Sequence, residues 1–499
     1  MRWSVSGTMA RFAMLSGLAL ASGFAQAQSV VTYHNAPNRS GSYTVPSLTF
    51  AAAAKLHKDT AFHAAFSGNV YAQPLYWQPS GAKVGLLIVA TESNLVYALN
   101  ANTGAVVWKT QVGTPVQSGM LPCGDISPEG VTGTPVIDAA SGRLYLDAST
   151  LQTGNVPRHM IYALSLTNGK VVSNWPLNVD NAMAARKATF SSEVQGERSA
   201  LQFFDGKLYI TYGGRAGDCG NYHGAVIEIT PSTIPKITGD WATRAGKGGI
   251  WSQGGATSDG GSLFVTTGNT SGASSWGDGE AVIRLLPGLA RSANIKDYFA
   301  PGNWQTLDAD DADLGGTAAI PIKVATTPSK PASRLIGLGK NGHAYLLNGP
   351  SLGGIGHALD NIVVSNSRII TAPAVYQGPH NAMVVFTNLA GLSSSCSGES
   401  LTMLRVSDTT APISTLWCAP LNGAGAPIVT TTDGLDDPIV WVTGAEGDNE
   451  IHGFNATTGK VVFSGANTGM NGLRHFGTLI AANGHLYVAA DNTVYAFAF

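Results

Sequence analysis

The densest group of acidic side chains lies in the run LDADDADLGG, which contains Asp308, Asp310, Asp311 and Asp313. Hard cations such as Ca²⁺ bind several carboxylate and carbonyl oxygens, and acids spaced along a turn can provide them. The run lacks the glycine and the distal glutamate of an EF-hand loop, so it is not a site of that type. We predict either a calcium site made by these four residues or a solvated acidic loop.

A second group that can do chemistry is the neighbouring pair Arg474 and His475. Histidine is the side chain best suited to moving protons near neutral pH, and an arginine beside it can hold a carboxylate or an oxyanion. Arg198 offers the same cationic chemistry elsewhere in the chain. The candidate catalytic residues are therefore Arg198, Arg474, His475 and Asp313, although His475 can also be structural.

Trp251 lies in the glycine-rich segment GGIWSQGG. A flat ring beside small residues can stack on a sugar or a quinone, or it can fill the core. The segment is not a phosphate loop, because it lacks the lysine and the following helix.

A repeat accounts for how such scattered residues can meet. Short apolar strands, often opened by a small residue and proline, recur at spacings of roughly 50 to 65 residues. The openers are Gln73–Trp77, Thr134–Asp138 and Ser199–Phe204, followed by copies near Ala256, Ala318, Pro373, Pro427 and Leu479. Further strands and glycine turns follow each opener, as in antiparallel sheets. Eight such units leave exposed strand edges that circular closure removes, so we predict an all-β, eight-bladed β-propeller of four-stranded antiparallel blades.

The last repeat unit ends at Phe499 after only three strands. We predict that the ring is closed by an N-terminal strand, namely Ser29–His34, which supplies the missing fourth strand. The segment Phe50–Phe66 has some helical pattern and is predicted as a short helix or a loop.

In a propeller, ligands collect where the loops leading into the innermost strands converge on the central channel. We expect these loops to build one funnel-shaped ligand site. The alternative is that their polar side chains only satisfy one another by hydrogen bonds and ion pairs. The residues that these loops carry are Gln73, Glu129, Glu197, Arg198, Trp251, Gln253, Asp313, Arg368, Arg474 and His475.

The N-terminus has the features of a secretory signal peptide. Arg2 and Arg11 are followed by the short apolar run Phe12–Phe24 and by the small residues of Ala25–Ala27. We predict cleavage after Ala27, no lipid anchor because no cysteine follows, and one mature domain over residues 28–499. An uncleaved anchor helix is the alternative.

The formal net charge is −2 and there is no basic block or later apolar run of membrane-spanning length, so we expect no nucleic acid and no membrane span. We also expect a monomer.

Export implies an oxidising compartment, in which the four cysteines can pair. Of the possible pairings, we favour Cys123–Cys219 between two long loops and Cys396–Cys418 within one predicted blade. None of the four forms a CxxC or CxxCH pattern, which argues against structural zinc and covalent haem.

The stretch Tyr97–Gly104, followed by Trp108, resembles the tryptophan-docking repeat of PQQ-type propellers, with Asn100 where aspartate is usual. His452–Phe463 and Tyr162–Trp175 are degenerate copies. The chain is thus similar to the quinoprotein-like superfamily, and the resemblance implies an eight-bladed propeller. That superfamily includes both PQQ dehydrogenases and cofactor-free scaffolds of outer-membrane assembly.

The resemblance favours a periplasmic or secreted oxidoreductase that acts on an alcohol or sugar with PQQ and Ca²⁺ in the funnel. Trp251 would stack on the cofactor, Asp313 would be the base or a metal ligand, and an arginine would polarise the quinone carbonyl. The other residues assigned to cofactor binding are Gln253, Gln73, Glu129, Glu197 and Arg368.

Two alternatives remain open. One is a lyase acting on a uronate-containing polysaccharide, in which Arg198 and Arg474 neutralise the uronate and His475 takes the proton. The other is a propeller that binds a small molecule, a carbohydrate or a protein without catalysis.

Overall fold

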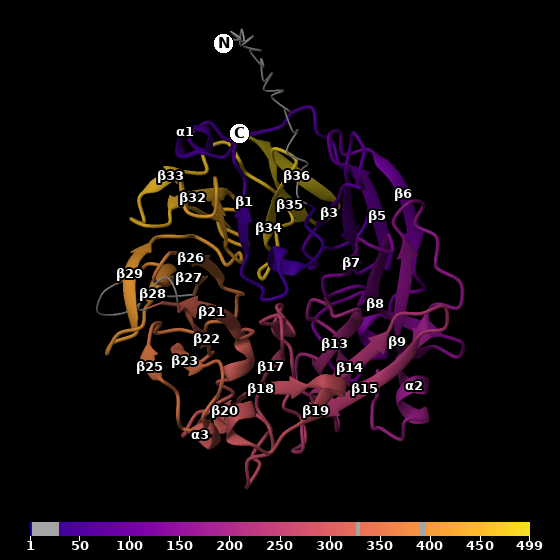
Figure 1. The fold of residues 1–499 in the computed structure, drawn as a ribbon. Helices are drawn as coiled ribbons and strands as arrows, with labels where there is room; N and C mark the ends of the chain where they lie inside the picture. Colours follow the sequence, from indigo (N-terminus) through magenta and orange to yellow (C-terminus); the bar gives the residue numbers. More distant parts are fainter. Residues whose placement is uncertain (2–28, 326–329, 389–395, 397) are drawn as a thin grey trace.

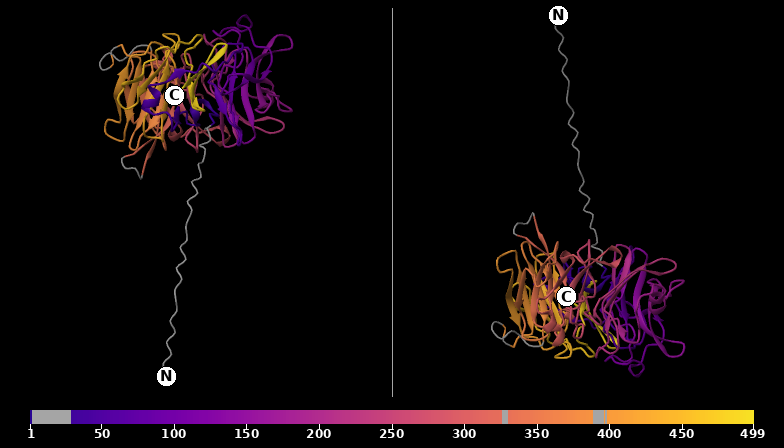
Figure 2. Two further views of the ribbon diagram at one scale, coloured as in Figure 1. Left: turned by 90° about the horizontal axis from the view of Figure 1, so that it is seen from above. Right: turned by 90° about the horizontal axis from the view of Figure 1, so that it is seen from below.

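The computed structural model describes Met1 and residues 29–325, 330–388, 396 and 398–499. These residues form eight small sheets arranged in a ring, and the chain passes from one sheet to the next around it (Figure 1). Seen at right angles the ring is a squat disc (Figure 2). The predicted all-β, eight-bladed propeller is confirmed.

The first four blades, each given from the innermost strand outward, span residues 75–300. Blade 1 is made of β3 (Leu75–Trp77), β4 (Leu86–Ala90), β5 (Leu95–Asn100) and β6 (Val106–Gln111). Blade 2 is made of β7 (Val136–Asp138), β8 (Arg143–Gln152), β9 (Val156–Ser165) and β10 (Leu177–Asn178). Blade 3 is made of β11 (Gln195–Gly196), β12 (Gln202–Phe204), β13 (Lys207–Gly214), β14 (Ala225–Thr230) and β15 (Lys236–Ala242). Blade 4 is made of β16 (Thr257–Ser258), β17 (Leu263–Thr267), β18 (Ala281–Leu286), β19 (Ala290–Arg291) and β20 (Tyr298–Ala300), which pairs with β24 (Gly354–Ile355).

The other four blades complete the circle. Blade 5 is made of β21 (Ile320–Val324), β22 (Ala332–Leu338), β23 (His343–Asn348) and β25 (Asp360–Val363). Blade 6 is made of β26 (Ala374–Gln377), β27 (Ala382–Thr387), β28 (Leu401–Val406) and β29 (Ile413–Ala419). Blade 7 is made of β30 (Ile428–Thr431), β31 (Ile439–Thr443), β32 (Ile451–Asn455) and β33 (Val461–Phe463), with β1 (Ser42–Thr44) along its inner edge. Blade 8 is made of β34 (Leu479–Ala482), β35 (His485–Ala490), β36 (Thr493–Ala498) and β2 (His57–Lys58).

The helices of the described residues are short and lie between strands. They are α1 (Phe50–Ala53), α2 (Val179–Ala185), α3 (Trp304–Ala309) and the 3₁₀ turns η1 (Tyr33–Asn35), η2 (Ser118–Met120), η3 (Pro287–Leu289), η4 (Ile295–Asp297) and η5 (Leu314–Gly316). Among the described residues, no helix has the length and apolar character needed to span a bilayer.

The core lies between neighbouring blades. Each sheet is covered on both faces by its neighbours, so a middle strand such as β31 is buried along its whole length and does not alternate between apolar and polar residues. Leu75 and Ile88 of blade 1 pack in one cluster with Leu144 and Leu164 of blade 2.

The tryptophan-docking motif fastens one blade to the next. Nε1 of Trp108 in β6 donates to the carbonyl of Leu166 at 2.9 Å, and the indole covers Gly169, where a Cβ would lie 2.5 Å from the ring. Trp417 in β29 repeats the contact, because its Nε1 donates to the carbonyl of Ala456 at 2.8 Å beside Gly459. The turn that lacks a tryptophan in its own repeat therefore receives one from the preceding blade.

An N-terminal strand closes the ring, as predicted, but it is not Ser29–His34. The closing strand is β2, in which His57 pairs with Ala498 and Lys58 with Phe497 of β36. This strand lies in the segment predicted as a helix or a loop, which also contains α1. The outermost strand of a blade faces solvent, which suits His57 and Lys58, whereas Val30 and Tyr33 are almost completely buried.

Residues 29–44, which we call the N-terminal strap, run round the central channel instead. The strap exchanges hydrogen bonds with inner strands of seven blades, from Val30 against Tyr76 in blade 1 to β1 against β30 in blade 7. Its Arg39 is only 1% exposed and donates to the carbonyls of Gly254 and Leu201. The strap therefore narrows the channel, and it borders a cavity of about 440 Å³ on the face opposite the candidate site.

Both favoured disulfides are present, between Cys123 and Cys219 and between Cys396 and Cys418. Disulfides of this kind persist in oxidising compartments. The predicted signal peptide, residues 1–27, lies outside the described residues apart from Met1.

Candidate functional site

Three adjoining cavities open on the face where loops lead into the inner strands, and shared lining residues join them into one funnel. The tryptophan lobe, of about 320 Å³, is lined by residues including Trp251, Asp313 and Lys340. The tyrosine lobe, of about 60 Å³, has Tyr33 of the strap in its wall. The asparagine lobe, of about 410 Å³, contains Asn388. Arg198 lines the first two lobes, His475 and Phe476 line the second and third, and Arg368 lines the first and third.

The tryptophan lobe contains a buried ion pair beside an aromatic ring. Nζ of Lys340 lies 2.9 Å from a carboxylate oxygen of Asp313 and 5.5 Å from the centre of the Trp251 ring. The backbone N–H of Asn269 donates to the other oxygen of Asp313 at 2.8 Å. Burial raises the pKa of Asp313, and the ammonium of Lys340 acts in the opposite direction. This carboxylate is held in one orientation by a cation and an amide.

The four aspartates of the acidic run do not surround one point. Asp308 is 5% exposed and accepts hydrogen bonds from the turn at Thr270 and Gly272. Asp310 is exposed, and the side chain of Asp311 is 64% exposed while contacting Lys340. Their different environments follow from the run itself, which ends helix α3 and then turns outward before it enters η5.

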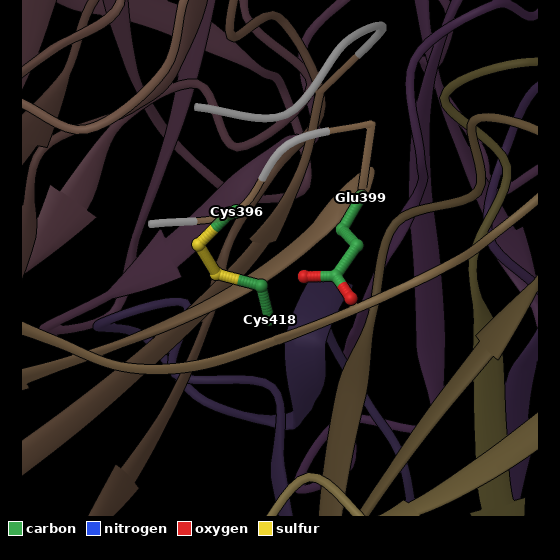
Figure 3. Close-up of side chains that lie close together, drawn as sticks. All are labelled: Cys396, Glu399 and Cys418. Atoms are coloured by element: carbon green, nitrogen blue, oxygen red, sulfur yellow. A yellow bond between two sulfur atoms is a disulfide. The ribbon is translucent and has the colours of Figure 1, made fainter. Parts of the chain in front are cut away.

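Among the described residues, one group of three acidic, histidine or cysteine side chains brings its ligand atoms together. It consists of Cys396, Glu399 and Cys418 (Figure 3). The two sulfurs are joined in a disulfide, so they are not the thiolates that bind metals. This group is therefore not a metal site.

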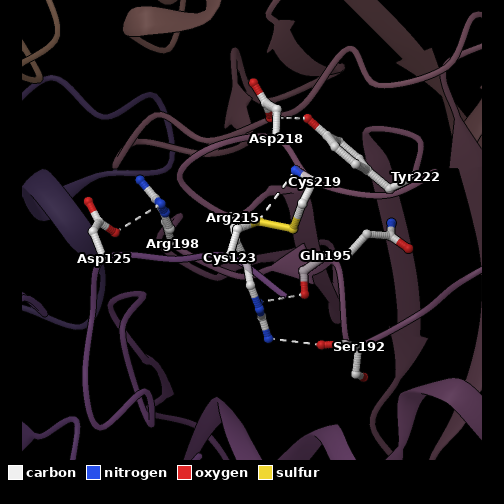
Figure 4. The surroundings of a disulfide bond; sticks show 9 residues. All are labelled: Cys123, Asp125, Ser192, Gln195, Arg198, Arg215, Asp218, Cys219 and Tyr222. Atoms are coloured by element: carbon white, nitrogen blue, oxygen red, sulfur yellow. Dashed lines mark hydrogen bonds and ion pairs between the residues drawn. A yellow bond between two sulfur atoms is a disulfide. The ribbon is translucent and has the colours of Figure 1, made fainter. Parts of the chain in front are cut away.

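Two of the predicted cofactor-binding residues lie below the funnel rather than in its lining. Glu129 pairs with Arg215 at 2.9 Å, and Arg215 also donates to the carbonyls of Gln195 and Ser192 next to the Cys123–Cys219 disulfide (Figure 4). Glu197 is 5% exposed and accepts a hydrogen bond from the N–H of Gly133. Burial raises the pKa of Glu197. These carboxylates brace the loops of blades 2 and 3.

Gln73 and Arg474 are likewise engaged with the protein. The Gln73 amide accepts from the N–H of His34 and donates to the carbonyl of Thr32, so it holds the strap. Arg474 pairs with Asp491, donates to the Tyr71 hydroxyl at 3.2 Å and lies over the Tyr71 ring. Neither residue lines one of the three lobes.

Arg198 and Arg368 give the rim of the funnel its positive charge, and His475 lines the same rim. Arg198 has a distant partner in Asp125, at 3.4 Å (Figure 4). Arg368 makes no hydrogen bond or ion pair with any residue that the structure describes. Nδ1 of His475 lies 2.8 Å from Glu446, whose pKa is lowered by the hydrogen bonds from His475 against the effect of burial.

The structure thus brings seven of the predicted residues into one funnel, and their roles stay predictions. They are Arg198, Trp251, Gln253, Asp311, Asp313, Arg368 and His475. Sequence reasoning missed several residues that lie beside them, namely Lys340, Asn269, Asp218 and Asn388. These four lie just after the second strand of a blade, and loops at that position face the same side as the loops entering the inner strands.

Comparison with known proteins supports the fold. A PQQ-type family model described as outer membrane protein assembly factor BamB matches residues 63–213. No curated protein matches the chain in sequence.

Among solved structures, a quinohemoprotein alcohol dehydrogenase from Comamonas testosteroni is similar, with a TM-score of 0.63 and 16% identity over 94% of this chain and 80% of that one. A europium-containing methanol dehydrogenase has a TM-score of 0.61 and 14% identity over 92% and 89% of the two chains. BamB from Moraxella catarrhalis has a TM-score of 0.50 and 14% identity over 89% and 98%.

These sequence identities are too low to transfer an activity, so the similarities concern the fold alone. The resemblance seen in the docking repeat is confirmed: the chain has the eight-bladed β-propeller fold of the PQQ-type repeat proteins.

Proposed function

We propose that the protein is a quinoprotein-type oxidoreductase that oxidises a hydroxyl group of an alcohol or sugar, with PQQ bound in the tryptophan lobe. The observation that carries the proposal is the Lys340–Asp313 ion pair beside the Trp251 ring in one cavity. A base, a cation and an aromatic surface are the groups needed to hold a flat anionic quinone and to deprotonate an alcohol.

The residues present fit PQQ. Its flat ring system matches the indole of Trp251. Its carboxylates match the weakly paired Arg198 and Arg368, which has no partner among the described residues, and both line this lobe. The same lobe is lined by Asp218 and Asn269, and side-chain oxygens of this kind are what a hard cation such as Ca²⁺ prefers. We assign Asp218 and Asn269 to the ion, in place of the four aspartates of the acidic run, and Asp313 to the base.

When bound, PQQ supplies the acceptor for the two electrons and the hydrogen that leave the substrate carbon. Asp313 takes the proton of the substrate hydroxyl. Its raised pKa makes the ionised carboxylate a stronger base than an exposed aspartate. Lys340 and the backbone N–H of Asn269 hold the Asp313 carboxylate in place. Lys340 also adds positive charge where negative charge develops on the oxygen of the substrate hydroxyl.

The proposed place of action is the periplasm or the cell exterior. Support comes from the two disulfides and from the signal-peptide pattern of residues 1–27.

Dye-linked oxidation of alcohols and sugars, after reconstitution with PQQ and Ca²⁺, tests the assignment of the base. Asp313→Asn should lower kcat by about 10²–10⁴-fold. Asp310→Asn is the matched control, because Asp310 is an exposed acid of the same run, and it should keep full activity. Equal activity of both variants would refute the role of Asp313, and an inactive wild-type protein across the panel would refute the function.

One contact favours a second candidate, a lyase acting on a uronate-containing polysaccharide. Glu446 holds Nδ1 of His475, which orients the ring so that Nε2 can accept a proton. Arg368, which pairs with no residue in the described part of the chain, lines the same lobe and can neutralise a uronate. Elimination would release products with a new carbon–carbon double bond, detectable by ultraviolet absorbance. His475→Gln should abolish that signal, and its absence from the wild-type protein on a uronate panel would exclude this candidate.

A further inference from the structure

The asparagine lobe is a cavity of about 410 Å³ between blades 6, 7 and 8, within the size range of small-molecule pockets. Its wall contains neutral polar side chains from separate loops, including Thr371, Asn388, Ser400 and Asn422, with Phe476 at the border with the tyrosine lobe.

Asn388, which directly follows β27, is the unusual member of this wall. It is only 3% exposed, and its backbone N–H is satisfied by the carbonyl of Ser400 at 2.9 Å. Its side-chain Nδ2 and Oδ1, however, have no hydrogen-bond partner among the described residues. Buried polar groups are almost always paired, because leaving them unpaired is costly. Asn388 lines the lobe, and its amide carries two donors and an acceptor that no described residue uses.

The charges at the lobe define what kind of ligand fits. Glu446 and His475 pair with each other, Arg368 is the one further charged side chain among the described residues of the lining, and the other polar side chains of the wall are neutral. Phe476 has a left-handed backbone, with φ of 69°, a strained conformation that bulky residues adopt mainly where a site requires it. Its ring gives the lobe one apolar surface beside several hydrogen-bonding groups.

From this arrangement we infer that the asparagine lobe binds a sugar ring that carries several neighbouring hydroxyl groups. Each hydroxyl both donates and accepts, so two of them can satisfy both ends of the Asn388 amide, while the C–H face of the ring packs on Phe476. A simple alkyl alcohol would leave the amide unpaired and is therefore a poor ligand. The inference names the substrate class of the proposed oxidoreductase, and it rests on that function only for what happens to the sugar after binding.

Binding is measured by calorimetry on the protein without PQQ, using D-glucose, D-galactose and D-glucuronate, with cyclohexanol as a ring that has a single hydroxyl. At least one sugar should bind at least about 10-fold more tightly than cyclohexanol. No sugar binding, or equal binding of cyclohexanol, would overturn the inference. Preference for glucuronate would keep the sugar site and favour the lyase over the oxidoreductase.

Two substitutions locate the site. Asn388→Leu has a similar shape without the amide, so it should weaken sugar binding at least about 10-fold and raise Tm by about 1–3 °C, since it removes unpaired buried atoms. Thr402→Val is the matched control, because the Thr402 hydroxyl is also buried and unpartnered in blade 6 but lines none of the three lobes. It should leave sugar binding unchanged.

A clear loss of stability or folding in Asn388→Leu would show that the amide is needed by the protein itself, and unchanged sugar binding would place the sugar elsewhere. Either result overturns the inference. Sugar binding without PQQ-dependent oxidation would refute the proposed function and leave the sugar site standing. Oxidation of simple alcohols without sugar binding would support the proposed function and refute the sugar site.

Discussion

Replacing Lys340 by methionine removes one half of the buried ion pair in the tryptophan lobe. Nζ lies 2.9 Å from Asp313, and the two side chains are only 10% and 6% exposed. With an effective dielectric constant of about 20, the gross Coulomb energy at this distance is about 6 kcal/mol. Desolvation cancels part of it, and breaking a buried pair usually costs about 3–5 kcal/mol. The contact with the exposed Asp311 adds at most about 1 kcal/mol.

We therefore expect Lys340→Met to lower the free energy of unfolding by about 3–5 kcal/mol near neutral pH, or Tm by about 3–5 °C for a chain of this length. The loss should depend on pH. Without the ammonium, the already raised pKa of Asp313 rises further, so the folded protein keeps its proton to higher pH than the unfolded chain. Stability then falls as pH increases above the ordinary pKa of an aspartate, and the deficit is smaller at about pH 5 than at about pH 8.

The assay is thermal unfolding of the wild-type protein, Lys340→Met, Asp313→Asn and the double variant at both pH values. Asp313→Asn should rescue most of the loss, because it removes the carboxylate that the single variant leaves unpaired. A loss that is independent of pH, or that the second substitution does not rescue, would refute the electrostatic account and indicate a packing effect.

Three further perturbations test other parts of the structure. Burial raises the pKa of Glu92 to about 8, so between about pH 5 and pH 8 the folded protein retains a proton that the unfolded chain has lost. Glu92→Gln should therefore stabilise the protein by about 2–4 kcal/mol above about pH 8 and by little near about pH 4. An equal change in Tm at the two pH values would contradict this. Trp108→Ala should cost about 3–5 kcal/mol by uncovering Gly169 between blades 1 and 2, as measured by denaturant unfolding, and a loss below about 1 kcal/mol would argue against docking. Replacing Cys123 and Cys219 by serine opens a loop of 96 residues and should lower the free energy of unfolding by about 4–5 kcal/mol. The same Tm for the wild-type protein in its oxidised and reduced forms would show that the disulfide does not stabilise the fold.

The repeat made the architecture predictable. Strand openers, glycine turns and the Trp108 motif are local patterns that recur, and each predicts one blade. The sequence predicts that an N-terminal strand closes the ring, but it points to the wrong segment. The strand that closes the ring, β2, is only His57–Lys58, which is too short to give a pattern. The buried run Ser29–His34 has a clear strand pattern but serves as part of the strap.

The site was predictable to a smaller extent, for a geometrical reason. The repeat marks the loops that enter the inner strands, and these loops contain Arg198, Trp251 and Asp313. The loops after the second strands reach the same face and supply Lys340 and Asn388. Such residues follow a strand and carry no signal of their own, so their proximity to the funnel emerges only when the antiparallel blades are assembled in a ring.

Thermal stability of the purified protein with PQQ and Ca²⁺, added separately and together, tests the central claim most directly. A ligand that binds only the folded state at about 100 times its Kd stabilises by about 2.7 kcal/mol, so we predict a rise in Tm of about 2–3 °C that requires both additives. Trp251→Leu should abolish this rise, and Trp276→Leu, which alters a tryptophan stacked on Tyr298 away from the funnel, should preserve it. An unchanged Tm for the wild-type protein, or a rise that survives Trp251→Leu, would contradict the account.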